Sequence, residues 1–137
     1  MKIGVAGSMQ FTEQMIDVCK QLEQLGHTTF MSKFKNNYVG KTDAEKEAQK
    51  LQDKYEHDAI REFWQPMQTA DALVVVNLDK NGIANYIGGN SFLEMGFAHV
   101  LNIPIYLLNP IPKMPHYETE IIAMKPVVVN GDLEKIK

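Results

Sequence analysis

Five short apolar segments along the chain have the pattern of buried strands, because apolar residues follow one another there instead of alternating with polar ones. Turn-forming residues bound the segments, which lie at Lys2–Ala6, Thr28–Met31, Ala72–Asn77, Ile105–Leu108 and Val127–Val129. Helix-type patterns separate them. This alternation predicts a parallel sheet with right-handed crossovers and helices on both faces.

Apolar residues at spacings of three and four predict three of the helices between these strands. They span about Phe11–Leu25, Phe92–Leu101 and Tyr117–Met124, and Gly26 ends the first in the manner of a C-cap. The segment Phe92–Leu101 is apolar nearly all round, so we expect it to be largely buried.

A polar helix is predicted between the second and third strands. The sequence Thr42-Asp43-Ala44-Glu45 has the capping-box pattern that starts a helix. We expect it to run to about Trp64 and to kink or end at Pro66, because proline lacks the N–H and crowds the preceding turn. Its charged stretch Lys46–His57 is interpreted mainly as a solvated face, with a partner-binding surface as the alternative.

Together these elements predict one α/β domain over residues 1–137, a doubly wound three-layer sandwich of the flavodoxin-like or Rossmann-like kind. The five parallel strands are expected in the order 2-1-3-4-5. In such sheets a ligand binds beyond the carboxyl ends of the strands, where the strand order switches. The loops at Gly7–Gln10 and Leu78–Gly89 open on that edge. Polar residues predicted to gather there are Ser8, Asn77, Asn90, Ser91 and Glu94.

Charge and composition narrow the classes of partner. A hydrophobic content of 45% in 137 residues suffices for one globular core. The net charge is −3 and the basic residues are scattered, whereas a protein that tracks nucleic acid carries a basic excess. We therefore expect that the protein does not bind a nucleic acid polymer. A single nucleotide stays compatible, since helix N-termini and loop amides can hold one phosphate.

The same composition bears on location and cofactors. No apolar run approaches the roughly 20 residues that span a bilayer, and the N-terminal sequence lacks the apolar stretch of a signal peptide, so no membrane association is expected. Cys19 is the only cysteine, which indicates a reducing cytoplasm. The four histidines lie far apart in the sequence, so we expect neither a metal site nor a cofactor.

The sequence from Gly88 to Glu94 has two interpretations. Glycines before a helix let the backbone approach a ligand, and the free N–H groups at the helix start favour an anion. Glu94 would then be a carboxylate that can attack a sugar carbon or stabilise an oxocarbenium ion. Alternatively, Ser91-Phe92-Leu93-Glu94 is a capping box, in which Glu94 only bonds back to the Ser91 amide.

Three segments of the chain resemble the nucleoside 2-deoxyribosyltransferase superfamily, which includes deoxynucleoside 5′-monophosphate N-glycosidases. Val5–Met9 resembles the opening strand and ligand loop of that family, and Ala70–Val76 resembles its third strand. The most specific segment, Asn90–Ala98, is similar to the family pattern Gly-Thr-x-x-Glu-x-Gly-x-Ala. The order and spacing agree over nearly the whole chain.

This resemblance implies an enzyme that cleaves or exchanges the N-glycosidic bond of a nucleoside or nucleotide. Glu94 would be the nucleophile that forms a glycosyl-enzyme intermediate. The residues expected to bind the substrate are Gly7, Ser8, Met9, Asn77, Gly88, Gly89, Asn90 and Ser91. The resemblance also favours a homo-oligomer, with a dimer expected, to which the apolar residues Trp64 and Met67 and the helix at Phe92–Leu101 would contribute surface.

The chain departs from the family pattern at several positions. The family acid that assists the departing base falls on Phe63, which transfers no proton, so the adjacent Glu62 is the expected substitute, with Asp71 a weaker choice. Gly88 stands where the deoxyribosyltransferases carry a sugar-binding aspartate. Met9-Gln10 stands where the N-glycosidases carry arginine.

Two further functions therefore stand beside the N-glycosidase or glycosyl-transfer hypothesis. One is a non-catalytic nucleotide-binding module with the same fold, which Phe63 favours. The other is a nucleoside monophosphate phosphoribohydrolase, whose Gly-Gly-x-Gly-Thr-x-x-Glu motif is partly matched by Gly88–Glu94. A phosphoribohydrolase would act on a different substrate but would cleave the same kind of bond.

Overall fold

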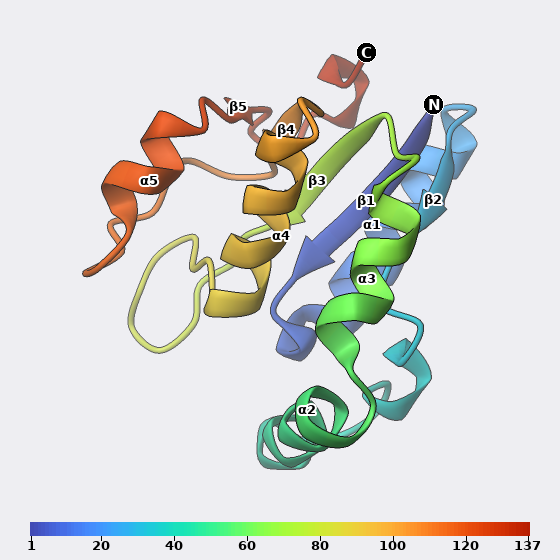
Figure 1. Ribbon diagram of the computed structural model, residues 1–137, viewed down its shortest axis with the longest axis vertical. Coiled ribbons are helices and arrows are strands. Elements are labelled where there is room, and N and C mark those ends of the chain that lie inside the picture. The colour runs from blue at the N-terminus through green and yellow to red at the C-terminus, as the bar shows by residue number, and fades with distance from the viewer.

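The computed structural model describes residues 1–137 and contains one five-stranded sheet. Every neighbouring pair of strands is parallel, and the order is β2-β1-β3-β4-β5, as predicted (Figure 1). The strands are β1 (Lys2–Gly7), β2 (Thr28–Phe30), β3 (Ala72–Val76), β4 (Ile105–Leu107) and β5 (Val127–Val128).

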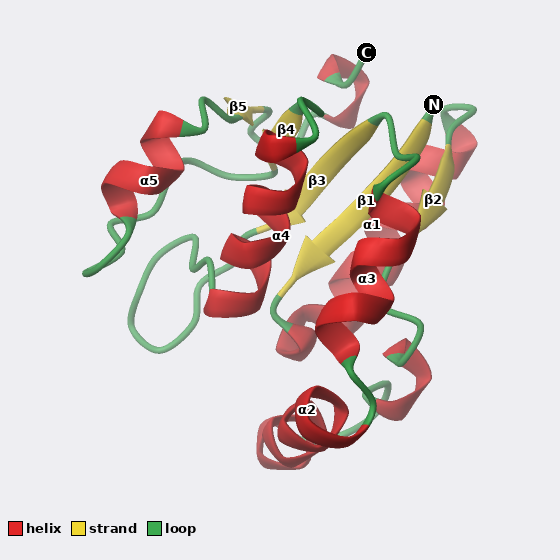
Figure 2. Ribbon diagram, viewed as in Figure 1, coloured by secondary structure: helices red, strands yellow, loops and turns green.

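Five α-helices connect and cover the strands (Figure 2). They are α1 (Thr12–Gln24), α2 (Asp43–Glu56), α3 (Ala59–Met67), α4 (Gly89–Val100) and α5 (Glu118–Ala123). Short 3-10 turns, η1 to η3, lie at Met9–Phe11, Lys35–Asn37 and Leu133–Lys135. None of the helices combines the length and the apolar character that crossing a membrane requires.

Helices on both faces of the sheet produce the three layers. Alternate residues of each strand point to opposite faces, so a fully apolar strand such as β3 contributes to two cores. Val74 and Val76 pack with α1 and the C-terminal segment, whereas Leu73 and Val75 pack with α3, α4 and α5. This burial on both faces confirms the doubly wound α/β fold.

The prediction of a single polar helix from Thr42 to about Trp64 is wrong, because two helices occupy this segment. Thr42 does start a helix through the expected capping box, but α2 ends at Glu56, and Asp58 has a left-handed backbone (φ 52°) before α3 begins. The break lets the chain change direction. As a result α3 packs in a layer on the sheet, while α2 lies beyond the carboxyl ends of the strands (Figure 1).

Long-range contacts hold α2 in that place. The Lys46 ammonium is buried, donates to Glu13 Oε2 at 2.7 Å and to the Gln10 carbonyl at 3.3 Å, and so joins α2 to the segment after β1. Tyr38 Oη donates to the buried Asp53 carboxylate at 2.6 Å. The expectation that Lys46–His57 is mainly a solvated face therefore holds for only part of the helix.

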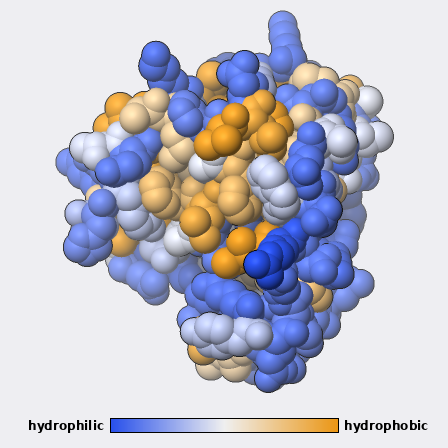
Figure 3. Space-filling model, viewed as in Figure 1, coloured by the Kyte–Doolittle hydropathy of each residue, from blue (hydrophilic) through white to orange (hydrophobic).

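Helix α4 also differs from the prediction. It begins at Gly89 rather than Phe92, and it is less buried than its composition indicates. Met95 and Ala98 are fully buried against the sheet, but Leu93 and Val100 on the outer side are exposed. The apolar outer side leaves a hydrophobic surface over α3 and α4, which Figure 3 shows in orange.

Candidate functional site

A polar pocket lies between the carboxyl edge of the sheet and α2. Its walls come from the loops after β1, β2 and β3, from α2 and the start of α3, and from the first two turns of α4. Nine of the predicted site residues line it: Gly7, Ser8, Met9, Glu62, Gly88, Gly89, Asn90, Ser91 and Glu94. The strand-order switch between β1 and β3 thus coincides with the pocket, as doubly wound sheets require.

A close backbone approach and the hydrogen bonds of one serine side chain position the loop after β1. A Cβ at Gly7 would lie 2.9 Å from the Val76 carbonyl oxygen of β3, so only glycine lets the two strands end side by side here. Ser8 Oγ then accepts from Gln10 N at 3.4 Å and from Lys80 Nζ at 2.9 Å. Lys80 belongs to the loop after β3, so this contact ties the two ligand-facing loops together.

The N-terminus of α4 faces the same pocket. Gly88 is the N-cap residue and supplies no side-chain cap, so the amides of the first turn, at Gly89, Asn90 and Ser91, have no partner inside the helix. Because Ser91 is the third helical residue and not the cap, the capping-box interpretation of Ser91 and Glu94 is wrong. The side chain of Glu94 is therefore not used to start the helix.

Glu94 lies in the second turn of α4 and contributes a carboxylate to the pocket. Its side chain is partly exposed, yet protein atoms surround the carboxyl group and exclude most of the water around it. This burial raises the pKa of Glu94 to about 8, and neither a hydrogen bond nor a neighbouring charge contributes to the shift. A strongly shifted carboxyl group without a structural partner, in a pocket, is typical of a functional site.

Glu62 approaches the pocket from the first turn of α3. It forms an ion pair with Lys33, with Nζ and Oε2 2.8 Å apart. The neighbouring Phe63 is 6% exposed and packs on Phe30, with ring centroids 5.5 Å apart. Both residues line the pocket, Glu62 with a carboxylate and Phe63 with an apolar side chain that also belongs to the core.

Asn77 and Asp71 have structural roles instead of lining the pocket. The fully buried Asn77 side chain donates to the carbonyls of Asn109 and Pro110 at 2.9 and 3.1 Å, and accepts from Asn109 N at 2.9 Å. Asp71 accepts from Lys2 N at 2.8 Å, before β3 begins. The expectation that Asn77 binds substrate is corrected, because its polar atoms hold the loop after β4 to the end of β3.

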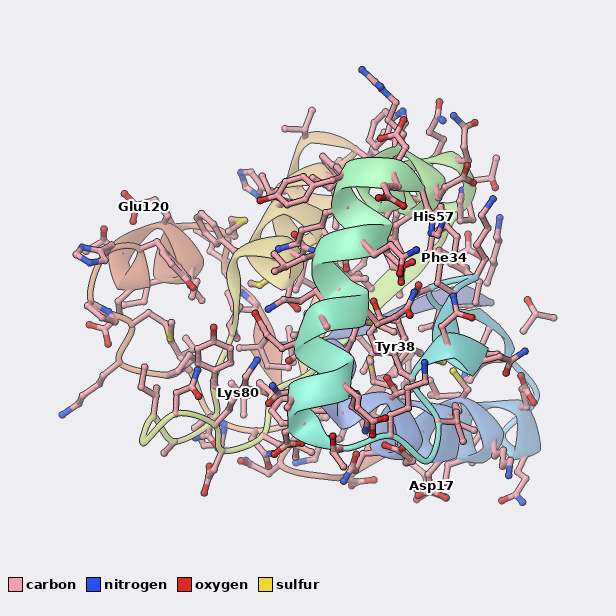
Figure 4. All side chains as sticks on the ribbon, turned by 90° about the horizontal axis from the view of Figure 1, so that it is seen from below. Asp17, Phe34, Tyr38, His57, Lys80 and Glu120 are labelled. Atoms are coloured by element: carbon pink, nitrogen blue, oxygen red, sulfur yellow. The ribbon has the colours of Figure 1, made fainter.

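Several pocket residues were not anticipated from the sequence. Helix α2 contributes Lys50, Asp53 and Lys54, and Tyr38 lies on the opposite side of α2 from Lys80 (Figure 4). Asp53 is fully occupied, since it accepts from Tyr38 and Gln49 and contacts His57 Nδ1 at 2.8 Å. Polar residues spaced by three and four in Lys46–His57 were the available signal, because they share one side of a helix.

Comparison with known proteins finds similarity in structure but not in sequence. Neither a protein-family model nor a curated protein sequence matches the chain. Among solved structures, a 2-deoxyribosyltransferase from Bacillus psychrosaccharolyticus is similar, with 21% sequence identity and a TM-score of 0.48. The match covers 78% of this chain and 71% of that chain.

Proposed function

We propose that this protein cleaves or exchanges the N-glycosidic bond of a nucleoside or nucleoside 5′-monophosphate, with Glu94 as the nucleophile. The observation that carries the proposal is a carboxylate with a raised pKa and no structural partner, in a polar pocket at the carboxyl edge of the sheet. The same glutamate stands in the most specific segment of the sequence resemblance, Asn90–Ala98.

The first chemical step forms a bond between a Glu94 carboxylate oxygen and C1′ of the sugar. The C1′–N bond breaks, and its electron pair leaves with the base, which takes up one proton. In the second step an oxygen of water, or a nitrogen of another base, attacks C1′ and releases Glu94 as a carboxylate. Hydrolysis therefore yields one free base and one free sugar, while exchange yields a new nucleoside.

Glu62 is the proposed acid, because it is the other pocket carboxylate that is not consumed by buried hydrogen bonds. It gives its proton to the departing base and regains one from the attacking water. Its carboxylate pairs with Lys33, so Glu62 has to leave that contact before it can reach the departing base. We therefore expect Glu62 to contribute less to the rate than Glu94.

Backbone groups around the carboxylate supply the binding surface for the sugar. The free amides of Gly89 and Asn90 and the Ser91 hydroxyl lie one turn before Glu94 on α4. Gly7 and Ser8 approach from the end of β1, and Met9 contributes a partly buried apolar side chain. These groups can orient the sugar hydroxyls so that C1′ faces Glu94.

The experiment is to incubate the protein with ribo- and deoxyribonucleosides and with their 5′-monophosphates, and to follow the released base by chromatography. Base release that requires Glu94 supports the proposal. Intact-mass measurement of quenched reactions adds a second test, since wild-type protein should gain the mass of one sugar unit and Glu94→Gln should not. Equal turnover by both proteins would overturn the assignment.

A non-catalytic nucleotide-binding module remains the second candidate, and the burial of Phe63 in the core favours it. It predicts saturable nucleotide binding without any base release. The phosphoribohydrolase hypothesis predicts release from ribonucleoside 5′-monophosphates alone. The same panel of substrates therefore separates all three functions.

A further inference from the structure

The pocket contains three lysines that no carboxylate within it neutralises. Lys50 and Lys54 lie one turn apart on α2, and Lys80 lies in the loop after β3. All three are half-buried. Lysines usually extend their ammonium groups into water. Partial burial of three ammonium groups around one pocket costs free energy, and a bound anion would offset that cost.

The partners of these lysines leave most of their charge available. Lys54 forms no hydrogen bond or ion pair, and Lys80 donates to the neutral Ser8 hydroxyl at 2.9 Å. Lys50 pairs with Glu47 at 2.9 Å, and that carboxylate, whose side chain is 48% exposed, also attracts Lys54 and Lys80 at longer range. An exposed pair of this kind is weak and can be exchanged for a better anion.

The ammonium groups also repel one another. Burial is the first cause that lowers the pKa of Lys54 and of Lys80, and the charge of Lys50 lowers both further. The exposed Glu47 offsets part of this repulsion, but the two other carboxylates of this wall are engaged elsewhere. Asp53 is occupied by Tyr38, Gln49 and His57, and Glu62 by Lys33. An anion placed between the three lysines would remove this repulsion.

We propose that Lys50, Lys54 and Lys80 form a phosphate subsite, so that the substrate of the pocket is a nucleoside 5′-monophosphate. This inference rests on the proposed function for the nucleoside part alone. The subsite lies apart from Glu94, because the lysines belong to α2 and to the loop after β3, whereas the carboxylate belongs to the second turn of α4. A 5′-phosphate meets this requirement, since C5′ is attached across the sugar ring from C1′.

The first measurement tests the anion site alone, with inorganic phosphate as the probe. NMR titration of the wild-type protein should shift the backbone amides of Gly7, Ser8 and Lys80 in a saturable way that weakens as the salt concentration rises. Lys54→Met and Lys50→Met keep the apolar stem and should each weaken phosphate binding by about three- to tenfold. The exposed Lys20 on α1 provides the matched control, and Lys20→Met should bind phosphate as wild type does.

The second measurement compares nucleosides with their 5′-monophosphates by calorimetry, in the Glu94→Gln background so that turnover does not consume the ligand. The 5′-phosphate should tighten binding by about 10- to 100-fold. In the double variant Lys50→Met/Lys54→Met the monophosphate should bind no more tightly than the nucleoside, whose own affinity should stay the same. Saturable phosphate binding without any nucleotide binding supports the anion site and contradicts the proposed function. Absence of phosphate binding, or equal affinity for nucleoside and monophosphate, overturns the subsite.

Discussion

The two hollows of this molecule lie on either side of α4 but differ in chemistry. The pocket at the carboxyl edge is lined by 20 residues, of which six are hydrophobic, whereas the groove between α3 and α4 is lined by eight, of which six are hydrophobic. Glu94 and Leu93 are adjacent in sequence, yet one faces the pocket and the other the groove.

This difference shows how one helix can serve two purposes. Charged groups held in a hollow without partners are expensive to bury and are typical of ligand binding or catalysis. Exposed apolar side chains such as Leu93 and Val100 are typical of a surface that another protein covers. We therefore interpret the pocket as the small-molecule site and propose that the groove binds a second copy of this chain.

The largest expected effect tests the pocket. Glu94→Gln keeps the size of the side chain but removes the nucleophile, so base release should fall by about 10³-fold or more. Steady-state assay on the best substrate of the panel measures this. Glu120→Gln on the exposed surface of α5 is the control and should keep full activity. A Glu94→Gln protein with near wild-type rates would mean that the carboxylate takes no part in the reaction.

The pH dependence of the same reaction should be large as well. Only the ionised carboxylate attacks C1′, and burial raises the pKa of Glu94 to about 8 in the free protein. In the Glu62→Gln variant, where the proposed acid no longer titrates, the value of kcat/KM should therefore rise about tenfold per pH unit below pH 8 and level off above it. A profile that is flat between pH 6 and 8 would contradict this assignment.

Ionisation of Glu94, which activates the nucleophile, should lower the stability of the folded protein. The unfolded chain loses this proton near the ordinary carboxyl pKa of 4.5 and the folded protein near 8, so between these values the native state binds more protons. The free energy of unfolding of the wild type consequently falls as pH rises through this window. Glu94→Gln removes the penalty and should be about 1–3 kcal/mol more stable at pH 8.

Urea unfolding at pH 5 and pH 8 measures this difference. The advantage of Glu94→Gln over the wild type should be larger at pH 8 than at pH 5. Equal stabilities at both pH values would show that the carboxylate is well solvated. A gain in stability together with a loss of activity would place Glu94 among the residues that are kept for function at the expense of the fold.

The smallest expected effect concerns the groove. Trp64 and Phe97 pack edge to face within it, with ring centroids 5.1 Å apart, and Val100 at its end is 83% exposed. We expect a dimer at micromolar concentration in which this surface is covered. Val100→Lys would bury a charge there and should raise the dissociation constant at least about tenfold.

Light scattering or sedimentation measures the change in mass with protein concentration. Val127→Lys on β5 is the matched control, because it places the same charge at an apolar, half-exposed position outside the groove. A wild-type protein that is monomeric at these concentrations would refute the dimer. Unchanged association in Val100→Lys would place the interface elsewhere.

The amino-acid sequence by itself determined the sheet and most of the site. Uninterrupted apolar segments such as Ala72–Val76 allow a buried strand and little else, and the alternation with helices then restricts the strand order. Gly7, Ser8 and Gly88–Ser91 lie at strand ends and a helix start, so local sequence places them at one edge. Glu94 follows on the same helix at a fixed offset.

Only the tertiary structure decided what surrounds Glu94. The break at Asp58 and the position of α2 depend on contacts between residues far apart in the chain, such as Lys46 with Glu13, and local periodicity carries no information on them. The same contacts bring Lys50 and Lys54 over the pocket. Likewise the N-cap of α4 at Gly88, instead of Ser91, decides that Glu94 is a free carboxylate and not part of a helix cap. The two arrangements have the same local sequence and differ only in which backbone groups the rest of the fold leaves unpaired.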